Sequence, residues 1–549
     1  MAADRLPRHV ARAPGRHVPS LPTYEALTGP GVGARFLRIP FLATTSAGTV
    51  LAGCDANYMS TGDSADHIDA VVRRRPAPVA DGAAASIDEG WEAPRAIAPL
   101  RMRDLADDEP DTQTGASVID GAILDDPAAG RQLLLIDLWP WNGGIFEHTR
   151  IDEDGAVRGG RARACSEHTG FVRADGRSCL LLSRVRRTGD ADGKQGNLNL
   201  NLDPADFDLA ADLDGPRDAD GLIAVRALLR GDDGTAHRGE AHLGEPTGYA
   251  LDDELVLHRH GRTLTVAQKG GAGRVPMRVV YRESELQVLN TQHLSLCVSE
   301  DDGRTWRLDR LVTDEMRLPG ERCALVGPGR GLRITEGAHA GRLLFPLYSR
   351  DAAEGSSTRA SCALSDDGGA TWRRGEAAPG PLQTTETQLV EAGEDLLLAV
   401  HRSPNPSGGA VLVSCSRDGG ETWSAPRSAL GDREEGVDCM VSAVALPDGA
   451  VSPATGRRHR ALAIATPGTR ARRHGAVHVL AVHDDDPGGG APRLEPVSTH
   501  ELTGPDVPFG YSCLTEDADG RLLVMFETTG TDSWAEGLVA MHLAEVPLG

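Results

Sequence analysis

Short runs of apolar residues recur along the chain, and Asp-Gly or Ala-Gly sequences commonly precede them. Runs of this length, bounded by turn signals, are typical of buried β-strands, because a helix needs a longer segment with a period of 3.6 residues. Helical periodicity is scarce. The pattern therefore predicts an all-β protein, with strands that include Leu133–Leu138, Arg342–Leu347, Leu396–Val400, Ala461–Ala465 and Arg521–Phe526.

One turn sequence occurs three times with the pattern Ser-x-Asp-x-Gly-x-Thr-Trp. The copies are Ser299–Trp306, Ser365–Trp372 and Ser416–Trp423, and a shortened fourth copy begins at Ser86. The Ser and Asp side chains can bond nearby backbone N–H groups, and glycine accepts the positive φ of a tight turn. Each full copy follows an apolar strand, at a spacing that suits four-stranded units. The repeats predict structural turns within the blades of a β-propeller.

One region does not follow the rhythm of the repeats. Residues 156–276 contain acidic runs and no copy of the turn sequence, which predicts an inserted small β-rich subdomain or elaborated loop. We expect residues 1–30 to be an N-terminal extension without a separate domain, and residues 31–155 and 277–549 to form the propeller. The acidic loops lack the fixed Gly and Glu of an EF-hand, so solvated loops are favoured over a calcium site.

Composition and charge exclude several classes of function. The formal net charge is −23, which repels phosphate backbones and argues against nucleic-acid binding. The nine cysteines show no zinc-ligand spacing, and we expect buried or free thiols, no metal and no cofactor. No apolar run is long enough to span a membrane, and residues 1–20 lack a secretory signal. We therefore expect a cytoplasmic location by default, with an extracellular one left open.

Six polar residues stand in recognisable local motifs. Arg38 belongs to Arg38-Ile39-Pro40, Glu386 to Thr384–Leu389, and Tyr511 to Phe509–Leu514. Asp63, with Asp66 as the alternative, precedes the strand-like segment Ile68–Arg74; Arg402 ends the run from Leu396; and Arg472 precedes Gly475, with Arg470 and Arg473 as alternatives. Only two of the 57 basic residues are lysines, so a single arginine carries little information, whereas six matches in order carry much more.

These motifs and the repeated turns resemble those of the bacterial sialidase family, whose repeats are called Asp boxes. The resemblance covers about residues 35–132 and 275–546, and it implies a six-bladed propeller. It also implies a retaining exo-sialidase in which Tyr511 is the nucleophile, Glu386 its base and Asp63 the acid/base. Arg38, Arg402 and Arg472 would hold the carboxylate of a sialylated glycan or related nonulosonic acid glycoside.

The implied chemistry suits the residue types. A sialoside carries a carboxylate on its anomeric carbon, and guanidinium groups are always charged and bind carboxylates bidentately. A carboxylate nucleophile would be repelled by that group, whereas a neutral phenol is not. Tyr has a pKa near 10 and needs a base, which Glu386 would supply. Sialidases with a Tyr nucleophile are a known exception to the two-carboxylate scheme of glycosidases.

Some positions depart from the family pattern and leave alternatives open. Asn57 stands where many relatives have an arginine for the sugar's 4-hydroxyl, while Asp120 matches an acid near that hydroxyl. Trp139, Trp141 and Phe146 are candidates for an N-acyl pocket or for the core. The alternatives are an intramolecular trans-sialidase that releases an anhydro sugar, an enzyme for a related nonulosonic acid, and a propeller that binds sialoglycans without cleaving them.

Overall fold

The computed structural model describes most of the chain outside the first 35 residues. The described residues are 36–57, 68–77, 87, 89–97, 116–140, 143–144, 163–164, 168–184, 187–189, 195–197, 207–230, 241–267, 273–281, 283–351, 357–404, 410–431, 437–484, 491–529, 539–546 and 548. Strands dominate these residues, and the helix found among them is the single turn α1 (Thr313–Met316). The expectation of an all-β protein is confirmed.

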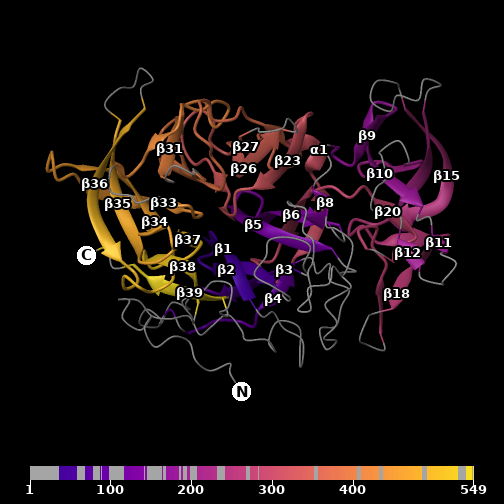
Figure 1. Ribbon diagram of the computed structural model, residues 1–549, viewed down its shortest axis with the longest axis horizontal. Coiled ribbons are helices and arrows are strands. Elements are labelled where there is room, and N and C mark those ends of the chain that lie inside the picture. The colour runs from indigo at the N-terminus through magenta and orange to yellow at the C-terminus, as the bar shows by residue number, and fades with distance from the viewer. Residues whose placement is uncertain are drawn as a thin grey trace.

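Six mainly antiparallel sheets follow one another around a ring (Figure 1). Blade 1 contains β1 (Phe36–Thr44), β2 (Val50–Asn57), β3 (Ile68–Arg75) and β4 (Arg95–Ile97). Blade 2 contains β5 (Ser117–Asp126), β6 (Arg131–Trp139), β21 (His293–Ser299) and β22 (Arg307–Leu311), with β24 (Gly329–Arg330) parallel to β5. Blade 3 contains β23 (Glu321–Val326), β26 (Leu343–Asp351), β27 (Arg359–Ser365) and β28 (Arg373–Arg374), with β25 (Leu332–Arg333) beside β26.

The remaining blades complete the ring. Blade 4 contains β29 (Thr387–Gly393), β30 (Leu396–Arg402), β31 (Val411–Ser416) and β32 (Arg427–Ser428). Blade 5 contains β33 (Ser442–Val451), β34 (Arg458–Pro467), β35 (Gly475–His483) and β36 (Arg493–Glu501). Blade 6 contains β37 (Ser512–Glu516), β38 (Leu522–Thr529) and β39 (Val539–Glu545). The predicted six-bladed propeller is confirmed.

A second sheet lies beside the propeller (Figure 1), and its strands occur in the sequence between β6 and β21. Its strands are β9 (Phe171–Ala174), β10 (Arg177–Arg184), β13 (Leu209–Ala211), β14 (Ile223–Leu229), β15 (His242–Leu251), β16 (Leu257–Arg259), β17 (Arg262–Thr263) and β20 (Leu286–Val288). Three small pairs accompany it: β7 (Gly143–Gly144) with β8 (Arg163–Ala164), β11 (Arg187–Gly189) with β12 (Gln195–Asn197), and β18 (Thr265–Ala267) with β19 (Arg274–Pro276). The sheet extends beyond residue 276 through β20, which pairs with β10.

One hydrophobic core joins the second sheet to the propeller. Leu180 and Leu182 of β10 share a buried cluster with Phe41 of β1 and Leu134 of β6. Phe41 is fully buried, and its ring leaves no room for a side chain at Gly53, where a Cβ atom would lie 2.0 Å from the ring. The inserted sheet is therefore packed against blades 1 and 2. Within the described residues, no helix is long and apolar enough to cross a membrane.

The repeated turns form as the sequence predicts. In the second copy, Ser365 Oγ and the backbone N–H of Thr371 donate to Oδ1 of Asp367 over 2.8 and 2.9 Å, and Thr371 Oγ1 donates to Oδ2 over 2.6 Å. These bonds, led by that from the Thr371 hydroxyl, lower the pKa of Asp367 to about 2. The backbone N–H of Gly369 donates to Ser365 Oγ, and Trp372 is buried. The Ser365 and Asp367 side chains thus satisfy the backbone N–H groups of Gly369 and Thr371 within this turn.

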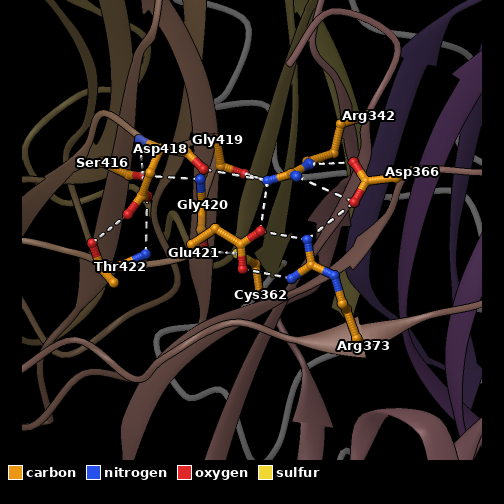
Figure 2. A network of polar contacts seen from close by, with 10 residues as sticks. All are labelled: Arg342, Cys362, Asp366, Arg373, Ser416, Asp418, Gly419, Gly420, Glu421 and Thr422. Atoms are coloured by element: carbon orange, nitrogen blue, oxygen red, sulfur yellow. Dashed lines mark hydrogen bonds and ion pairs between the residues drawn. The ribbon is translucent and has the colours of Figure 1, made fainter. Parts of the chain in front are cut away.

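The variable positions of the turns connect neighbouring blades. Arg342, just before β26, binds both carboxylate oxygens of Asp366, which occupies the second position of the second copy (Figure 2). The same guanidinium donates to backbone carbonyl oxygens of Asp418 and Gly419 in the third copy over 3.3 and 3.0 Å. Arg373 joins Asp366 to Glu421. This network fastens blade 3 to blade 4.

Candidate active site

A hydrogen-bonded Tyr–Glu pair lies at the centre of the propeller. Glu386 stands immediately before β29 and Tyr511 immediately before β37, so both occupy the starts of innermost strands. Tyr511 Oη donates to Oε1 of Glu386 over 2.5 Å. Both residues are buried, at 5% and 6% exposure for Tyr511 and Glu386. The Asp boxes follow β21, β27 and β31 and therefore lie at the opposite ends of their blades.

Arg402 completes this pair. Its Nη1 donates to both oxygens of Glu386 over 2.9 and 2.7 Å, and to Tyr511 Oη over 2.7 Å. Burial is the largest single influence and opposes the charged guanidinium, but the combined charges of the surrounding groups, led by the Glu386 carboxylate, raise the pKa of Arg402 well above its usual value. A positive charge beside a phenol favours the phenolate form. The geometry is suited to withdrawing a proton from Tyr511 while stabilising the oxygen left behind.

Two further arginines face the same tyrosine. The guanidinium carbons of Arg38, Arg402 and Arg472 lie 5.7, 5.9 and 5.2 Å from the centre of the Tyr511 ring. Of the two alternatives to Arg472, Arg470 is exposed and Arg473 donates to the backbone oxygen of Asp506. Three positive charges within 6 Å of one ring form a site for an anion beside a phenol.

A buried carboxylate holds Arg38 and Tyr511 in place. Oε1 of Glu527 accepts a 2.8 Å hydrogen bond from the backbone N–H of Ile39 and lies 3.4 Å from Nε of Arg38. Oε2 accepts a 3.2 Å bond from the backbone N–H of Tyr511. Glu527 is fully buried. It therefore fixes the start of β1 relative to the start of β37.

Three site segments have a non-glycine residue in the left-handed region: Ile39, Asp120 and Arg472, with φ of 53°, 63° and 55°. The first two lie at register shifts in β1 and β5. Bulges of this kind redirect a side chain at a functional site, and such backbone strain is typical of sites where position matters more than local stability. Positive φ values at non-glycine residues in three separate segments therefore indicate backbone strain at the centre of the site.

Asp120 lies on β5, the innermost strand of the propeller's blade 2. Asn57 is the last residue of β2, the second strand of the neighbouring blade 1. Both are buried, and the backbone N–H of Asp120 donates to Oδ2 of Asp55 over 3.2 Å. Asp63 and its alternative Asp66 lie outside the described residues, as do Trp141 and Phe146. Trp139 is buried in one apolar cluster with Tyr511. The described structure thus brings together Arg38, Glu386, Arg402, Arg472 and Tyr511 of the predicted set.

Sequence reasoning missed three residues of this centre: Glu527, Asp438 and Tyr348. Asp438 contacts both Arg402 and Arg472. Tyr348 is buried, and burial followed by the charge of Asp120 raises the pKa of its phenol well above the usual value. Glu527 had a usable signal, because it is an acid that continues the apolar run Leu522–Phe526. Asp438 and Tyr348 had none, since no local motif marks them.

The fold and the repeated turns define an Asp-box β-propeller. A family model described as a BNR repeat-like domain matches residues 253–534. The chain belongs to this family, and within it to the bacterial sialidase type. Among the described residues, no group of histidine, cysteine, aspartate and glutamate side chains is arranged to hold a metal ion.

Individual relatives match nearly the whole chain. The anhydrosialidase of Macrobdella decora is 26% identical over 93% of this chain and 60% of its own length. Sialidase B of Streptococcus pneumoniae is 24% identical over 94% of this chain and 65% of its own length. The chain thus spans less than two thirds of each of these two relatives. The solved intramolecular trans-sialidase of Ruminococcus gnavus superimposes with a TM-score of 0.69 at 22% identity, over 94% of this chain and 95% of that one, which shows a shared fold.

Proposed function

We propose that the protein cleaves terminal sialic acids, or related nonulosonic acids, from glycoconjugates with Tyr511 as the nucleophile. The single observation that carries this proposal is the 2.5 Å hydrogen bond from Tyr511 to Glu386, with Nη1 of Arg402 donating to the same phenolic oxygen. A base on one side and a cation on the other are what a phenol needs to become a nucleophile near neutral pH.

The arginines supply the reason for using a phenol. The substrate's carboxylate is attached to the anomeric carbon, so Arg38, Arg402 and Arg472 would hold an anion next to the reacting centre. A neutral nucleophile avoids the repulsion that an aspartate or glutamate would suffer there. Guanidinium groups keep their charge throughout the pH range of the reaction.

The proposed reaction has two displacements. In the first, Glu386 takes the phenolic proton, Tyr511 Oη bonds to the anomeric carbon, and the glycosidic bond breaks while Asp63 protonates the departing oxygen. In the second, Asp63 takes a proton from water, the water oxygen bonds to the anomeric carbon, and the Tyr511 bond breaks as Glu386 returns the proton. Two inversions retain the configuration. The role of Asp63 rests on its motif.

A second candidate is intramolecular transfer, in which a hydroxyl of the bound sugar replaces water in the second step. The observation that favours it is similarity to an anhydrosialidase over 93% of this chain, the inserted sheet included. In that reaction the sugar hydroxyl attacks the anomeric carbon and its proton passes to Asp63, while the Tyr511 bond breaks, Glu386 returns the phenolic proton, and an anhydro sugar leaves. Both candidates share the first displacement.

Product analysis by NMR on a fluorogenic N-acetylneuraminic acid glycoside tests both candidates. First release of the α-anomer supports hydrolysis with retention, and an anhydro product supports intramolecular transfer. Tyr511→Phe should remove most of either product. Tyr249→Phe is a matched control, because Tyr249 in β15 also donates to a glutamate, Glu285, over 2.6 Å but lies in the inserted sheet. Binding without turnover by the wild type would contradict an enzyme and favour a sialoglycan-binding propeller.

A further inference from the structure

The residue Asp438 stands between two arginines of the proposed carboxylate clamp. It belongs to the segment Val437–Val441, which leads into the innermost strand of blade 5. Its Oδ1 accepts a 2.8 Å hydrogen bond from Nε of Arg402. Its backbone oxygen accepts bonds from Nε and Nη2 of Arg472 over 3.3 and 3.2 Å. One residue therefore holds both guanidinium groups, through its side chain and its main chain.

These contacts determine which N–H groups of Arg402 and Arg472 remain available to a ligand. Arg402 uses Nε on Asp438 and Nη1 on Glu386 and Tyr511, which leaves its Nη2 without an acceptor in the described part of the chain. Arg472 uses Nε and Nη2 on Asp438, which likewise leaves Nη1 without a described acceptor. A planar carboxylate is bound best by fixed N–H groups that point at it.

We propose that Asp438 is a positioning residue that directs Nη2 of Arg402 and Nη1 of Arg472 toward the substrate's carboxylate. This inference rests on the proposed function. Asp438 acts through the arginines and contacts no reacting atom. Its carboxylate is 36% exposed, so its charge is partly screened by water, and its effect comes mainly from the hydrogen bond that orients Arg402.

The two effects of Asp438 can be separated by two substitutions. Asp438→Ala removes the acceptor for Nε of Arg402 and frees the guanidinium to rotate, while the backbone oxygen still holds Arg472. Asp438→Asn keeps an oxygen acceptor and removes the negative charge beside the clamp. If orientation matters, alanine weakens the binding of a carboxylate and asparagine retains it or strengthens it slightly.

The test measures inhibition by the unsaturated planar-ring analogue of N-acetylneuraminic acid and by its methyl ester, with KM and kcat for the fluorogenic glycoside. We expect Asp438→Ala to weaken inhibition by the acid at least about tenfold, as loss of a charged hydrogen bond does. Inhibition by the ester should change by less than about threefold. KM should rise by a larger factor than kcat falls. Asp438→Asn should keep most of the preference for the acid.

Control variants keep the outcomes distinct. Asp506→Ala removes an exposed aspartate from the nearby loop between β36 and β37 and should leave the preference for the acid unchanged. Thermal unfolding of Asp438→Ala verifies that the variant is folded. If the wild type prefers the acid and Asp438→Ala keeps that preference in full, the role of Asp438 is wrong while the proposed function stands. If the wild type neither cleaves the glycoside nor prefers the acid, the proposed function is wrong, and this inference fails with it.

Discussion

Tyr511 and Glu386 are 125 positions apart in the chain, and the Tyr511 hydroxyl nevertheless donates a 2.5 Å hydrogen bond to the Glu386 carboxylate. The two residues precede innermost strands of blades 6 and 4, so they meet only because the ring of blades closes. Arg402, at the end of β30, joins them. The proposed chemistry therefore depends on the closed propeller, because no single blade contains the pair.

Replacing either member of this pair should remove most of the activity, and replacing both should cost little more. Tyr511→Phe removes the proposed nucleophilic oxygen, and Glu386→Gln keeps the hydrogen-bonding shape but cannot take the proton. We expect each substitution to lower kcat/KM by about 10²-fold to 10⁴-fold, because the two groups act as one unit. Steady-state kinetics on the fluorogenic glycoside measures all three variants. Strictly multiplicative losses in the double variant would show two independent contributions and contradict the paired role.

The buried Glu527 gives a prediction about stability. Glu527→Leu leaves the backbone N–H groups of Ile39 and Tyr511 without the acceptor that Glu527 provides, and it removes one ion-pair partner of Arg38. We expect the free energy of unfolding to fall by about 3 kcal/mol, as for other buried charged partners. Glu527→Gln keeps one acceptor oxygen and should lose less. Urea unfolding followed by fluorescence measures both variants, and equal losses would indicate that packing alone matters at this position.

Features that depend on a few neighbouring residues are predictable from the sequence. Features that depend on closure of the ring of blades are less predictable. The Asp boxes were predictable because each bond runs within four positions, as from Thr371 to Asp367. Glu386, Arg402, Arg472 and Tyr511 were proposed from family motifs, and the structure places them together. Asp438 lies in a segment with no motif, and only the packing of blade 5 against blade 4 brings it to the arginines. The role of Asp63 stays a prediction.

The network between blades 3 and 4 predicts unequal effects for its two arginines (Figure 2). The Arg342 side chain is 6% exposed and donates to two backbone oxygens as well as to Asp366, whereas that of Arg373 is 45% exposed. Arg342→Met should lower the free energy of unfolding by about 2 to 3 kcal/mol, because buried acceptors lose their donor. Arg373→Met should cost less than about 1 kcal/mol, as exposed ion pairs do.

Urea unfolding of both variants measures this difference. It is carried out with and without about 0.5 M salt, a concentration that screens exposed charges. Salt should reduce the effect of Arg373→Met and leave most of that of Arg342→Met. Equal losses for the two variants would contradict the view that Arg342 is the fastening residue. Neither residue lies near Tyr511, so both variants should retain turnover at temperatures where they are folded.

The last prediction concerns acid sensitivity at the junction between the inserted sheet and blade 2. His293, the first residue of β21, is fully buried, and burial followed by the charge of Arg317 lowers the pKa of its imidazole to about 3. The ordinary value is about 6.5, so the unfolded chain binds a proton below pH 6.5 that the folded protein does not bind until pH falls near 3. The stability linked to His293 is therefore complete above pH 6.5 and is lost as pH falls through this window.

The loss amounts to about 1.4 kcal/mol for each pH unit within the window. His293→Leu removes the titrating group, so between pH 7 and pH 5 its free energy of unfolding should fall by about 2 kcal/mol less than that of the wild type. His260→Asn is the control, because His260 is exposed at a turn and asparagine accepts its positive φ. Urea unfolding at both pH values measures all three proteins. An equal fall for wild type and His293→Leu would mean that His293 is protonated in the folded protein.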